Sequence, residues 1–344
     1  MTRRARLRTM IAATLLAALP ARADPVADFY RGKEVRVVIG LPAGGGYDIY
    51  GRLFARHLSR FIPGNPVVVA QNMPGAAAIP MTNSMAAQQP RDGTVIGVGV
   101  GSNATAALFS APGARYDARL LTWIGSMNSE VGLVLAYKTA KVKTTADLFT
   151  TELVVGGSGA TDGNVMFPAV MNKVLGTKFR IIPGYGSTNT VALAMERGEI
   201  DGMGSWHYSS ISTNKPEWLR DGSINFLVQL ALAKHPAMPA EIPLVVDLAK
   251  TPEQRAILEL VFAQQDMARP IFAPPGLPPE RAKALRDAFA AWSRDPAVLG
   301  EAEQMKLEIN RPMGGEDMKI LIDRLHAMPG DIVTKAADAI QVGG

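Results

Sequence analysis

Residues 35–58 read VRVVIG, LPAGGGYD and IYGRLFARHL, three consecutive segments with different patterns. The first segment is apolar and rich in β-branched residues, which predicts a buried strand. Three glycines follow, and glycine permits a tight turn that leaves backbone N–H groups uncovered. Asp48 then occupies the expected N-cap of an amphipathic helix. A strand, a glycine turn and a helix start together direct N–H donors and a helix dipole at an anion.

The same unit occurs a second time, further along the chain. Leu153 to Val155 is a predicted strand, residues 156–163 read GGSGATDG, and a helix is expected over about 165–175. Strands and helices alternate throughout, which predicts an α/β fold with two mostly parallel sheets flanked by helices. We expect a first domain from residues 24–125 plus 242–344 and a second from 126–241, with a ligand cleft between them.

The N-terminus carries an export signal. Four arginines within residues 3–8 precede the apolar run Met10 to Leu19, and Ala21-Arg22-Ala23 has the form of a signal-peptidase site. The apolar run is too short for a stable membrane anchor. We therefore expect residues 1–23 to be removed by cleavage after Ala23, and a periplasmic location; the sequence leaves the general and the twin-arginine export routes open.

Removal of the signal peptide changes the charge. The full chain has a formal net charge of +5, but residues 1–23 contain five arginines and no acid. The mature chain is therefore formally neutral, which argues against nucleic acid as a partner. It contains no cysteine and only four scattered histidines, so neither a disulfide framework nor a metal site is expected. No cofactor is expected, and the mature protein should be a monomer.

Five short motifs, in order along the mature chain, resemble one family. They are PAGGGYD at 42–48, QNMPGA at 71–76, PRDG at 90–93, GEID at 198–201 and APPGLPPE at 273–280. Together they resemble the P-A-G-G-x-x-D, E-N-x-P-G-A, P-x-D-G, G-x-V-D and A-P-x-G-x-P-x-E motifs of the substrate-binding proteins of tripartite tricarboxylate transporters, also called Bug or TctC-type receptors.

The resemblance implies a function and a partner. It implies a periplasmic-binding-protein-like fold whose two domains close on a small organic carboxylate, either a di- or tricarboxylate or an aromatic acid. It also implies delivery to a membrane permease of one large and one small subunit. In this family, two strand–turn–helix units hold the carboxylate, and they correspond here to Ala43–Asp48 and Gly157–Asp162.

Polar and aromatic side chains at strand exits complete the candidate site. Tyr47 replaces a residue that is often small in the family, and Trp206 and Tyr208 follow a predicted strand, which suggests a preference for aromatic or larger acids. Asp48 is expected to organise its loop, because a carboxylate repels an anion. The candidate ligand-binding residues are Ala43, Gly44, Gly45, Gly46, Tyr47, Asp48, Ser102, Asn103, Gly157, Ser158, Gly159, Ala160, Thr161, Asp162, Tyr185, Ser187, Asp201, Trp206 and Tyr208.

Other functions have weaker support. Residues 156–160, GGSGA, resemble a nucleophile elbow, and Asp201 and His207 follow in the order of a hydrolase triad, but the last elbow position is Ala instead of Gly. Residues 99–104, GVGSNA, resemble a dinucleotide-binding fingerprint, but an exported protein has little access to a dinucleotide cofactor. The alternatives to a transport receptor are thus an exported serine hydrolase and a co-receptor for a membrane sensor kinase. The leading hypothesis is a non-catalytic receptor.

Overall fold

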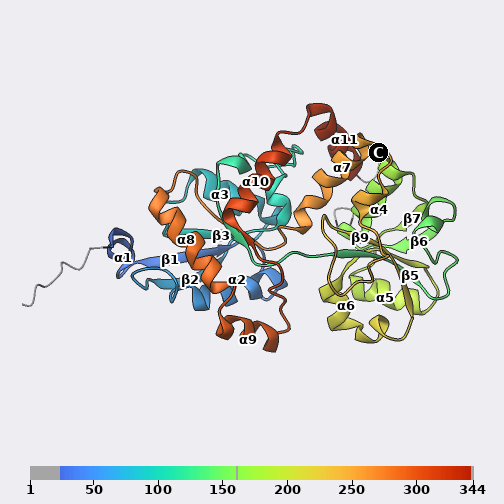
Figure 1. Ribbon diagram of the computed structural model, residues 1–344, viewed down its shortest axis with the longest axis horizontal. Coiled ribbons are helices and arrows are strands. Elements are labelled where there is room, and N and C mark those ends of the chain that lie inside the picture. Colours follow the sequence, from blue (N-terminus) through green and yellow to red (C-terminus); the bar gives the residue numbers. More distant parts are fainter. Residues whose placement is uncertain (1–23, 160–161, 342–344) are drawn as a thin grey trace, which may run out of the picture.

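A computed structural model describes residues 24–159 and 162–341 (Figure 1). The expected signal peptide, 1–23, lies outside these residues. The described chain forms two lobes, each built on one sheet with helices on its faces, so the expected two-domain α/β fold is confirmed.

The first sheet has six strands in the order β11-β4-β10-β3-β1-β2. β1 is parallel to both β2 and β3, whereas β10 is antiparallel to β3 and β4, and β11 is antiparallel to β4. The strands span Glu34–Ile39 (β1), Val67–Asn72 (β2), Val95–Val98 (β3), Thr122–Ser126 (β4), Pro270–Ala273 (β10) and Met313–Gly314 (β11).

The second sheet has five strands in the order β7-β6-β8-β5-β9. β6 is parallel to β7 and β8, and β5 is antiparallel to β8 and β9. The strands span Gly132–Tyr137 (β5), Leu153–Gly156 (β6), Phe179–Ile182 (β7), Gly202–His207 (β8) and Ile224–Leu230 (β9).

Both sheets are mixed: most strands in each run in one direction, as expected, and β10, β11 and β5 run against them. The reason lies in the connections between the lobes. A segment that comes from the other lobe enters the sheet at the C-terminal ends of its parallel strands. It must therefore run antiparallel to them. β5 shows this directly, because its first residue, Gly132, pairs with His207, the last residue of β8.

The helices cover both sheets, and two late helices return to the second lobe. α7 and α11 both contact α4, which packs on β8 (Figure 1). The domain bounds 24–125 plus 242–344 and 126–241 stay a prediction. The helices span Pro25–Tyr30 (α1), Gly46–Leu58 (α2), Ile79–Ala87 (α3), Gly163–Leu175 (α4), Thr188–Glu196 (α5), Tyr208–Asn214 (α6), Pro252–Phe262 (α7), Pro279–Trp292 (α8), Pro296–Gln304 (α9), Gly315–His326 (α10) and Gly330–Ile340 (α11), with short 3₁₀ turns including Ala76–Ala78 (η1), Gly101–Ala104 (η2) and Ala263–Gln265 (η7).

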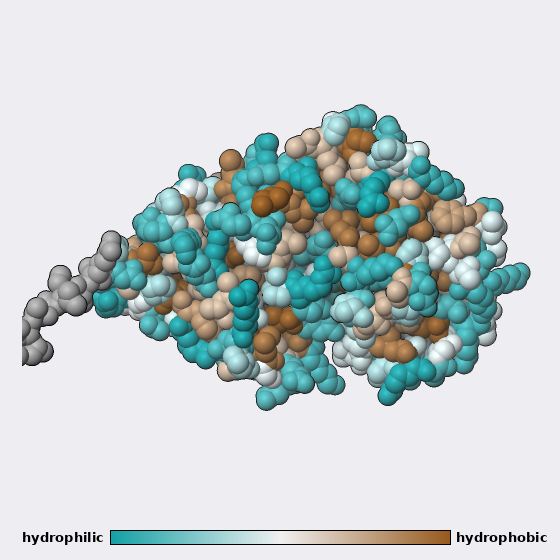
Figure 2. All heavy atoms as spheres, viewed as in Figure 1, coloured by the Kyte–Doolittle hydropathy of each residue, from teal (hydrophilic) through white to brown (hydrophobic). Residues whose placement is uncertain are grey.

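Three connections join the lobes: residues 127–131 between β4 and β5, residues 266–269 between η7 and β10, and residues 327–329 between α10 and α11. The first two are hydrogen-bonded to each other, from Met127 N to Arg269 O and from Glu130 N to Gln265 O. Outside, the lobes are separated by a notch at the lower edge of the molecule (Figure 2). In the part of the chain that the structure describes, no helix is long and apolar enough for a membrane span.

Candidate functional site

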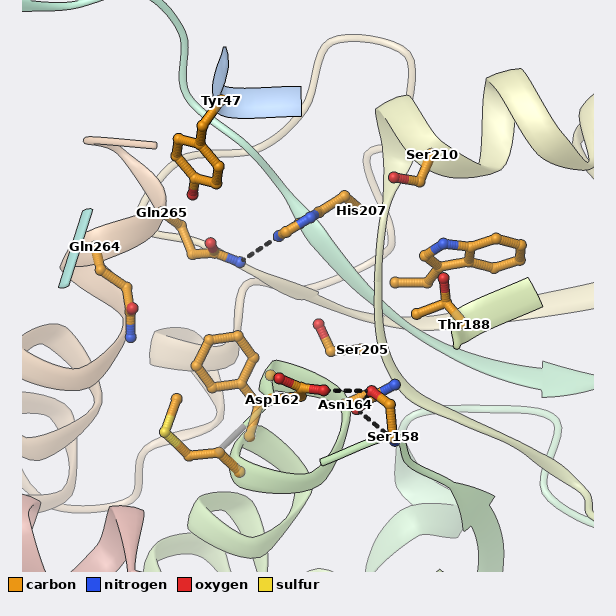
Figure 3. Close-up of a pocket in the computed structure, with 14 residues that line it drawn as sticks. Tyr47, Ser158, Asp162, Asn164, Thr188, Ser205, His207, Ser210, Gln264 and Gln265 are labelled. Carbon is orange, nitrogen blue, oxygen red and sulfur yellow. Dashed lines mark hydrogen bonds between the residues drawn. The ribbon is translucent and has the colours of Figure 1, made fainter. Parts of the chain in front are cut away.

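A cavity of 420 Å³ lies where the two lobes face each other (Figure 3). Tyr47, from the start of α2 in the first lobe, lies on one side, and Ser158, Asp162 and Asn164 of the second lobe lie on the other. The rest of the lining comes from β8, from the helices α4, α5 and α6, and from η7. It consists of Gly163, Met166, Phe167, Thr188, Ser205, Trp206, His207, Ser210, Gln264 and Gln265.

A smaller cavity of 190 Å³ adjoins the main cavity on the side of the first lobe. The two cavities have four lining residues in common: Tyr47, His207, Gln264 and Gln265. The side cavity is otherwise lined by Ala77, Val100, Gly101, Ser102, Glu130, Ala268 and Arg269. The site is therefore one space with two compartments, and Tyr47 and Gln265 stand between them.

The glycine turn of the first lobe is held by Asp48. This carboxylate is buried and accepts hydrogen bonds from Gly44 N at 2.8 Å, from Asn72 Nδ2 at 2.8 Å and from Arg52 Nε at 2.9 and 3.0 Å. The N-cap prediction for Asp48 is wrong: α2 begins at Gly46 and its N-cap is Gly45. Asp48 instead reaches back from the first turn of the helix to close the loop, as the expected organising role requires.

The pKa of Asp48 reflects these contacts. Burial alone would raise this pKa, but the hydrogen bonds from Arg52, Gly44 and Asn72 outweigh burial, and the pKa is lowered. Asp48 is thus a charged, fully engaged structural group at neutral pH, and its negative charge is offset by Arg52.

An aspartate closes the second turn in the same way. Asp162 is the N-cap of α4, and its Oδ2 accepts hydrogen bonds from Gly159 N at 2.8 Å and from Ser158 Oγ at 2.6 Å. The two turns are therefore built alike, as the sequence repeat predicts. The Ser158 hydroxyl donates its hydrogen bond to Asp162, so it stabilises the turn.

Asn164 leaves a free donor at the start of α4. Ser158 N–H donates to Asn164 Oδ1 at 3.2 Å, so the amide oxygen faces the turn and Nδ2 faces away from it. Asn164 is 4% exposed, and its Nδ2 has no hydrogen-bond partner among the described residues. An unpartnered buried donor costs stability unless a ligand or water completes it. Together with the N–H groups of the first helical turn, it favours an acceptor in the cavity.

The side cavity holds the most buried ion pair of the described chain. Arg269 and Glu130 have side chains 13% and 5% exposed, with Nη2 and Oε1 3.5 Å apart. The Arg269 guanidinium lies 4.2 Å from the centre of the Tyr47 ring. Burial raises the pKa of Tyr47, while Arg269 acts to lower it and Glu130 to raise it. The Tyr47 phenol is therefore neutral near pH 7 and able to donate a hydrogen bond.

Five of the nineteen candidate residues line the two cavities: Tyr47, Ser102, Ser158, Asp162 and Trp206. Ala160 and Thr161 lie outside the described residues. The other twelve candidates are absent from the lining of both cavities: Ala43, Gly44, Gly45, Gly46, Asp48, Asn103, Gly157, Gly159, Tyr185, Ser187, Asp201 and Tyr208.

Several of these twelve have visible structural roles. Asn103 is fully buried, accepts a hydrogen bond from Val100 N and donates one to Ala77 O. Its side chain therefore links the loop after β3 to η1 and does not line either cavity. Ser187 is the N-cap of α5. Asp201 precedes β8 and lines a separate surface cavity, because the site is formed at the opposite end of that strand. The Tyr208 ring packs against His235, with ring centres 4.1 Å apart.

Sequence reasoning missed most of the polar lining. Gln264 and Gln265 end η7, Arg269 lies on the connection that follows it, and Glu130 lies on the connection between β4 and β5; no local motif marks these segments. The argument that placed Ser158 at a strand exit applies to two further residues. Asn164 follows the glycine turn after β6, and Ser205 lies near the end of β8. His207 was considered only as a catalytic base.

The hydrolase arrangement is not assembled. Ser158 Oγ is bonded to Asp162, and His207 Nε2 contacts Gln265 Nε2 at 3.5 Å. No hydrogen bond joins His207 to Ser158 or to Asp201 in residues 24–159 and 162–341. Within the same residues, no group of three or more His, Cys, Asp or Glu is placed to hold a metal ion.

Known proteins share this architecture. A TctC solute-binding protein from Polaromonas superposes with a TM-score of 0.70 at 18% identity, covering 89% of this chain and 99% of that one. This is the fold of the Bug and TctC-type solute-binding proteins. The periplasmic binding protein BugD has the same fold (TM-score 0.57, 18% identity, 89% and 98% covered), as has MatC from Rhodopseudomonas palustris with bound malate (TM-score 0.57, 21% identity, 88% and 99% covered).

Sequence comparison adds one local match. A UPF0065 protein in the gbd 5′ region of Cupriavidus necator is 39% identical over 87 residues, a segment that is only a quarter of this chain and a quarter of that protein. No protein-family model matches the chain. The fold that the resemblance of the five motifs implies is thereby confirmed, since TctC and Bug proteins share it.

Proposed function

We infer that the chain is a periplasmic solute-binding receptor that captures a small organic carboxylate between its lobes and hands it to a membrane permease of one large and one small subunit. The observation that carries this proposal is the two-compartment cavity between two like-built turns, each closed by an aspartate. The receptor fold and the malate bound to one protein with that fold support the same conclusion.

The binding chemistry follows from the lining. The N–H groups at the start of α4 and the free Nδ2 of Asn164 supply donors on one side, and the neutral Tyr47 phenol and Gln265 supply donors on the other. The carboxylate of Asp162 accepts hydrogen bonds within its own turn and repels a second anion. The carboxylate of the ligand is therefore expected to lie toward the donors of Asn164 and away from Asp162. Closure of the lobes would then exclude water and strengthen each hydrogen bond.

The magnitudes are consistent with transport. Micromolar affinity corresponds to about −8 kcal/mol, and three or four charge-assisted hydrogen bonds at roughly 1.5–3 kcal/mol each are of the same order. No catalytic step is proposed, because Ser158 Oγ donates to the carboxylate that closes its own turn, and among the described residues His207 contacts Gln265 instead of Ser158 or Asp162.

A ligand screen tests the proposal. The mature chain, residues 24–344, is refolded to remove carried-over ligand and screened by thermal shift against aliphatic, dicarboxylic, tricarboxylic and aromatic acids. Calorimetry then measures the affinity for each acid that raises the melting temperature. We expect at least one carboxylate to bind in the micromolar range or tighter, and the matched amide of that acid to fail. The absence of binding by every carboxylate would contradict the proposal.

The location and the permease need their own tests. Cleavage after Ala23 predicts a mature N-terminus at Asp24, which N-terminal sequencing of the exported protein checks. Transport and sensing differ in their partner: a receptor for transport is required for uptake of the acid, whereas a co-receptor for a sensor kinase is required only for the transcriptional response to it.

A further inference from the structure

The side cavity contains a charged pair whose two members are unequally satisfied. Glu130 accepts hydrogen bonds from Ser209 Oγ on both of its oxygens, at 2.9 and 3.2 Å, and a longer one from Asn128 Nδ2 at 3.4 Å. Its carboxylate therefore has neutral donors in addition to Arg269. Glu130 would keep much of its stabilisation if Arg269 turned to another anion.

Arg269 is the less satisfied partner. A guanidinium has five N–H donors. In the described residues, Nη1 donates to Ala268 O at 3.1 Å, Nη2 reaches Glu130 only at 3.5 Å, and Nε is buried with no hydrogen-bond partner. A bidentate contact between Arg and a carboxylate has much shorter distances than this one. The cation is thus the member of the pair with donors to spare.

The position of Arg269 is fixed beside the ligand space. Its backbone N–H donates to Ser126 Oγ, and its carbonyl accepts from Met127 N, so the residue is anchored to the other inter-lobe connection. Its guanidinium lies over the rings of Tyr47 and Tyr50, at 4.2 and 5.0 Å from their centres. Tyr47 lines both compartments, so the guanidinium stands next to the boundary between them.

We propose that Arg269 is a specificity-determining residue that binds a second anionic group of the ligand in the side cavity, in exchange for its loose contact with Glu130. This inference rests on the proposed function. One carboxylate of the ligand occupies the main cavity near Asn164, and the second enters the side cavity and takes the free donors of Arg269. Glu130 competes for Arg269, so it limits the affinity for a diacid and has little effect on a monoacid.

Matched acids test the assignment by calorimetry. Adipate and hexanoate have the same six-carbon chain and differ in one terminal carboxylate. In Arg269→Met, we expect the affinity for adipate to fall by about 10- to 100-fold, the range of one or two charge-assisted hydrogen bonds, and that for hexanoate to change by less than about threefold. Arg269→Lys, which keeps the charge but loses the planar fork, should be intermediate. Glu130→Gln should bind adipate more tightly than the wild type.

A double variant separates ligand binding from folding. If Arg269 merely neutralises Glu130, Arg269→Met will weaken both acids alike and the Glu130→Gln/Arg269→Met protein will recover adipate binding. If Arg269 binds the ligand, the double variant will be stably folded by circular dichroism and still bind adipate much more weakly than Glu130→Gln, because neither protein has the Glu130 charge and only the single variant has the guanidinium. Equal losses for the two acids, recovery in the double variant, or wild-type protein that binds adipate no more tightly than hexanoate would each overturn the inference. Hexanoate binding that survives in every variant would leave the proposed function intact.

Discussion

The buried Asp48 provides a quantitative test of how the first turn is held. Asp48 and Arg52 form an i,i+4 pair in α2, and the Asp48 side chain is 4% exposed. Asp287 and Lys283 form a pair of the same spacing in α8, but their side chains are 63% and 75% exposed. The two pairs differ mainly in burial and in the extra donors around Asp48, so they form a matched comparison.

The expected cost follows from the lost acceptor. In the wild type, two carboxylate oxygens of Asp48 accept these hydrogen bonds. Asp48→Asn leaves one acceptor oxygen, and its new NH₂ group faces another donor, either the N–H of Gly44 or Arg52. At roughly 1.5–3 kcal/mol for each charge-assisted hydrogen bond, we expect the free energy of unfolding to fall by about 2–4 kcal/mol. Asp287→Asn should cost about 0–0.5 kcal/mol, as exposed pairs do.

The assay is urea unfolding of the mature chain, followed by tryptophan fluorescence, with the slope m unchanged between variants. The pH dependence gives a second check. Because the pKa of Asp48 is lowered in the folded state, its stabilisation is present above the ordinary pKa of about 4 and is lost as the pH falls below it. The gap between wild type and Asp48→Asn should therefore shrink in acid. A cost below 0.5 kcal/mol at pH 7, on the order of an exposed pair, or an equal cost for Asp287→Asn, would refute the reasoning.

Three further changes test the packing and the site. A Cβ on Gly40 would lie 2.3 Å from Ala78 Cβ, so Gly40→Ala should destabilise by about 1–3 kcal/mol in urea unfolding, whereas Gly46→Ala, which meets nothing within 4 Å, should not. Ser158→Ala removes the hydroxyl that donates to Asp162 within the same turn and should weaken carboxylate binding by about 5- to 30-fold in calorimetry, with no esterase activity in either protein; wild-type turnover lost in the variant would revive the hydrolase. Trp206 lines the main cavity, so Trp206→Phe should lower the affinity for benzoate relative to hexanoate, and an unchanged ratio would remove the aromatic preference.

Local sequence was sufficient for the paired turns because their chemistry is local. A β-branched run, a glycine turn and an aspartate a few residues later form the same loop at Gly44 and at Gly159. Asp201 could also have been judged from sequence: it precedes its strand, and at about 3.3 Å per residue the six residues of β8 carry it away from the end where His207 lies.

Other features depend on distant contacts and leave no local pattern. The small residues of segment 76–88 favour a single helix, but Ala76, Ala77 and Ala78 have φ of +35°, +51° and +63°, and α3 begins only at Ile79. This costly conformation is held from outside, because Asn103 Nδ2 donates to Ala77 O and Ala78 packs fully buried against Gly40. Arg269 is hidden for the same reason: only the tertiary structure places the segment between the lobes inside the ligand space.

Closure of the two lobes on a carboxylate is the central claim, and the absence of cysteine makes it directly measurable. Cysteines introduced at the exposed Lys283 of the first lobe and Glu152 of the second accept a donor and an acceptor dye without competition from native thiols. With the acid that binds best in the screen, energy transfer between the dyes should change with the same midpoint as the calorimetric titration. Carboxylate binding with no change in transfer, or no carboxylate that changes it, would contradict the account.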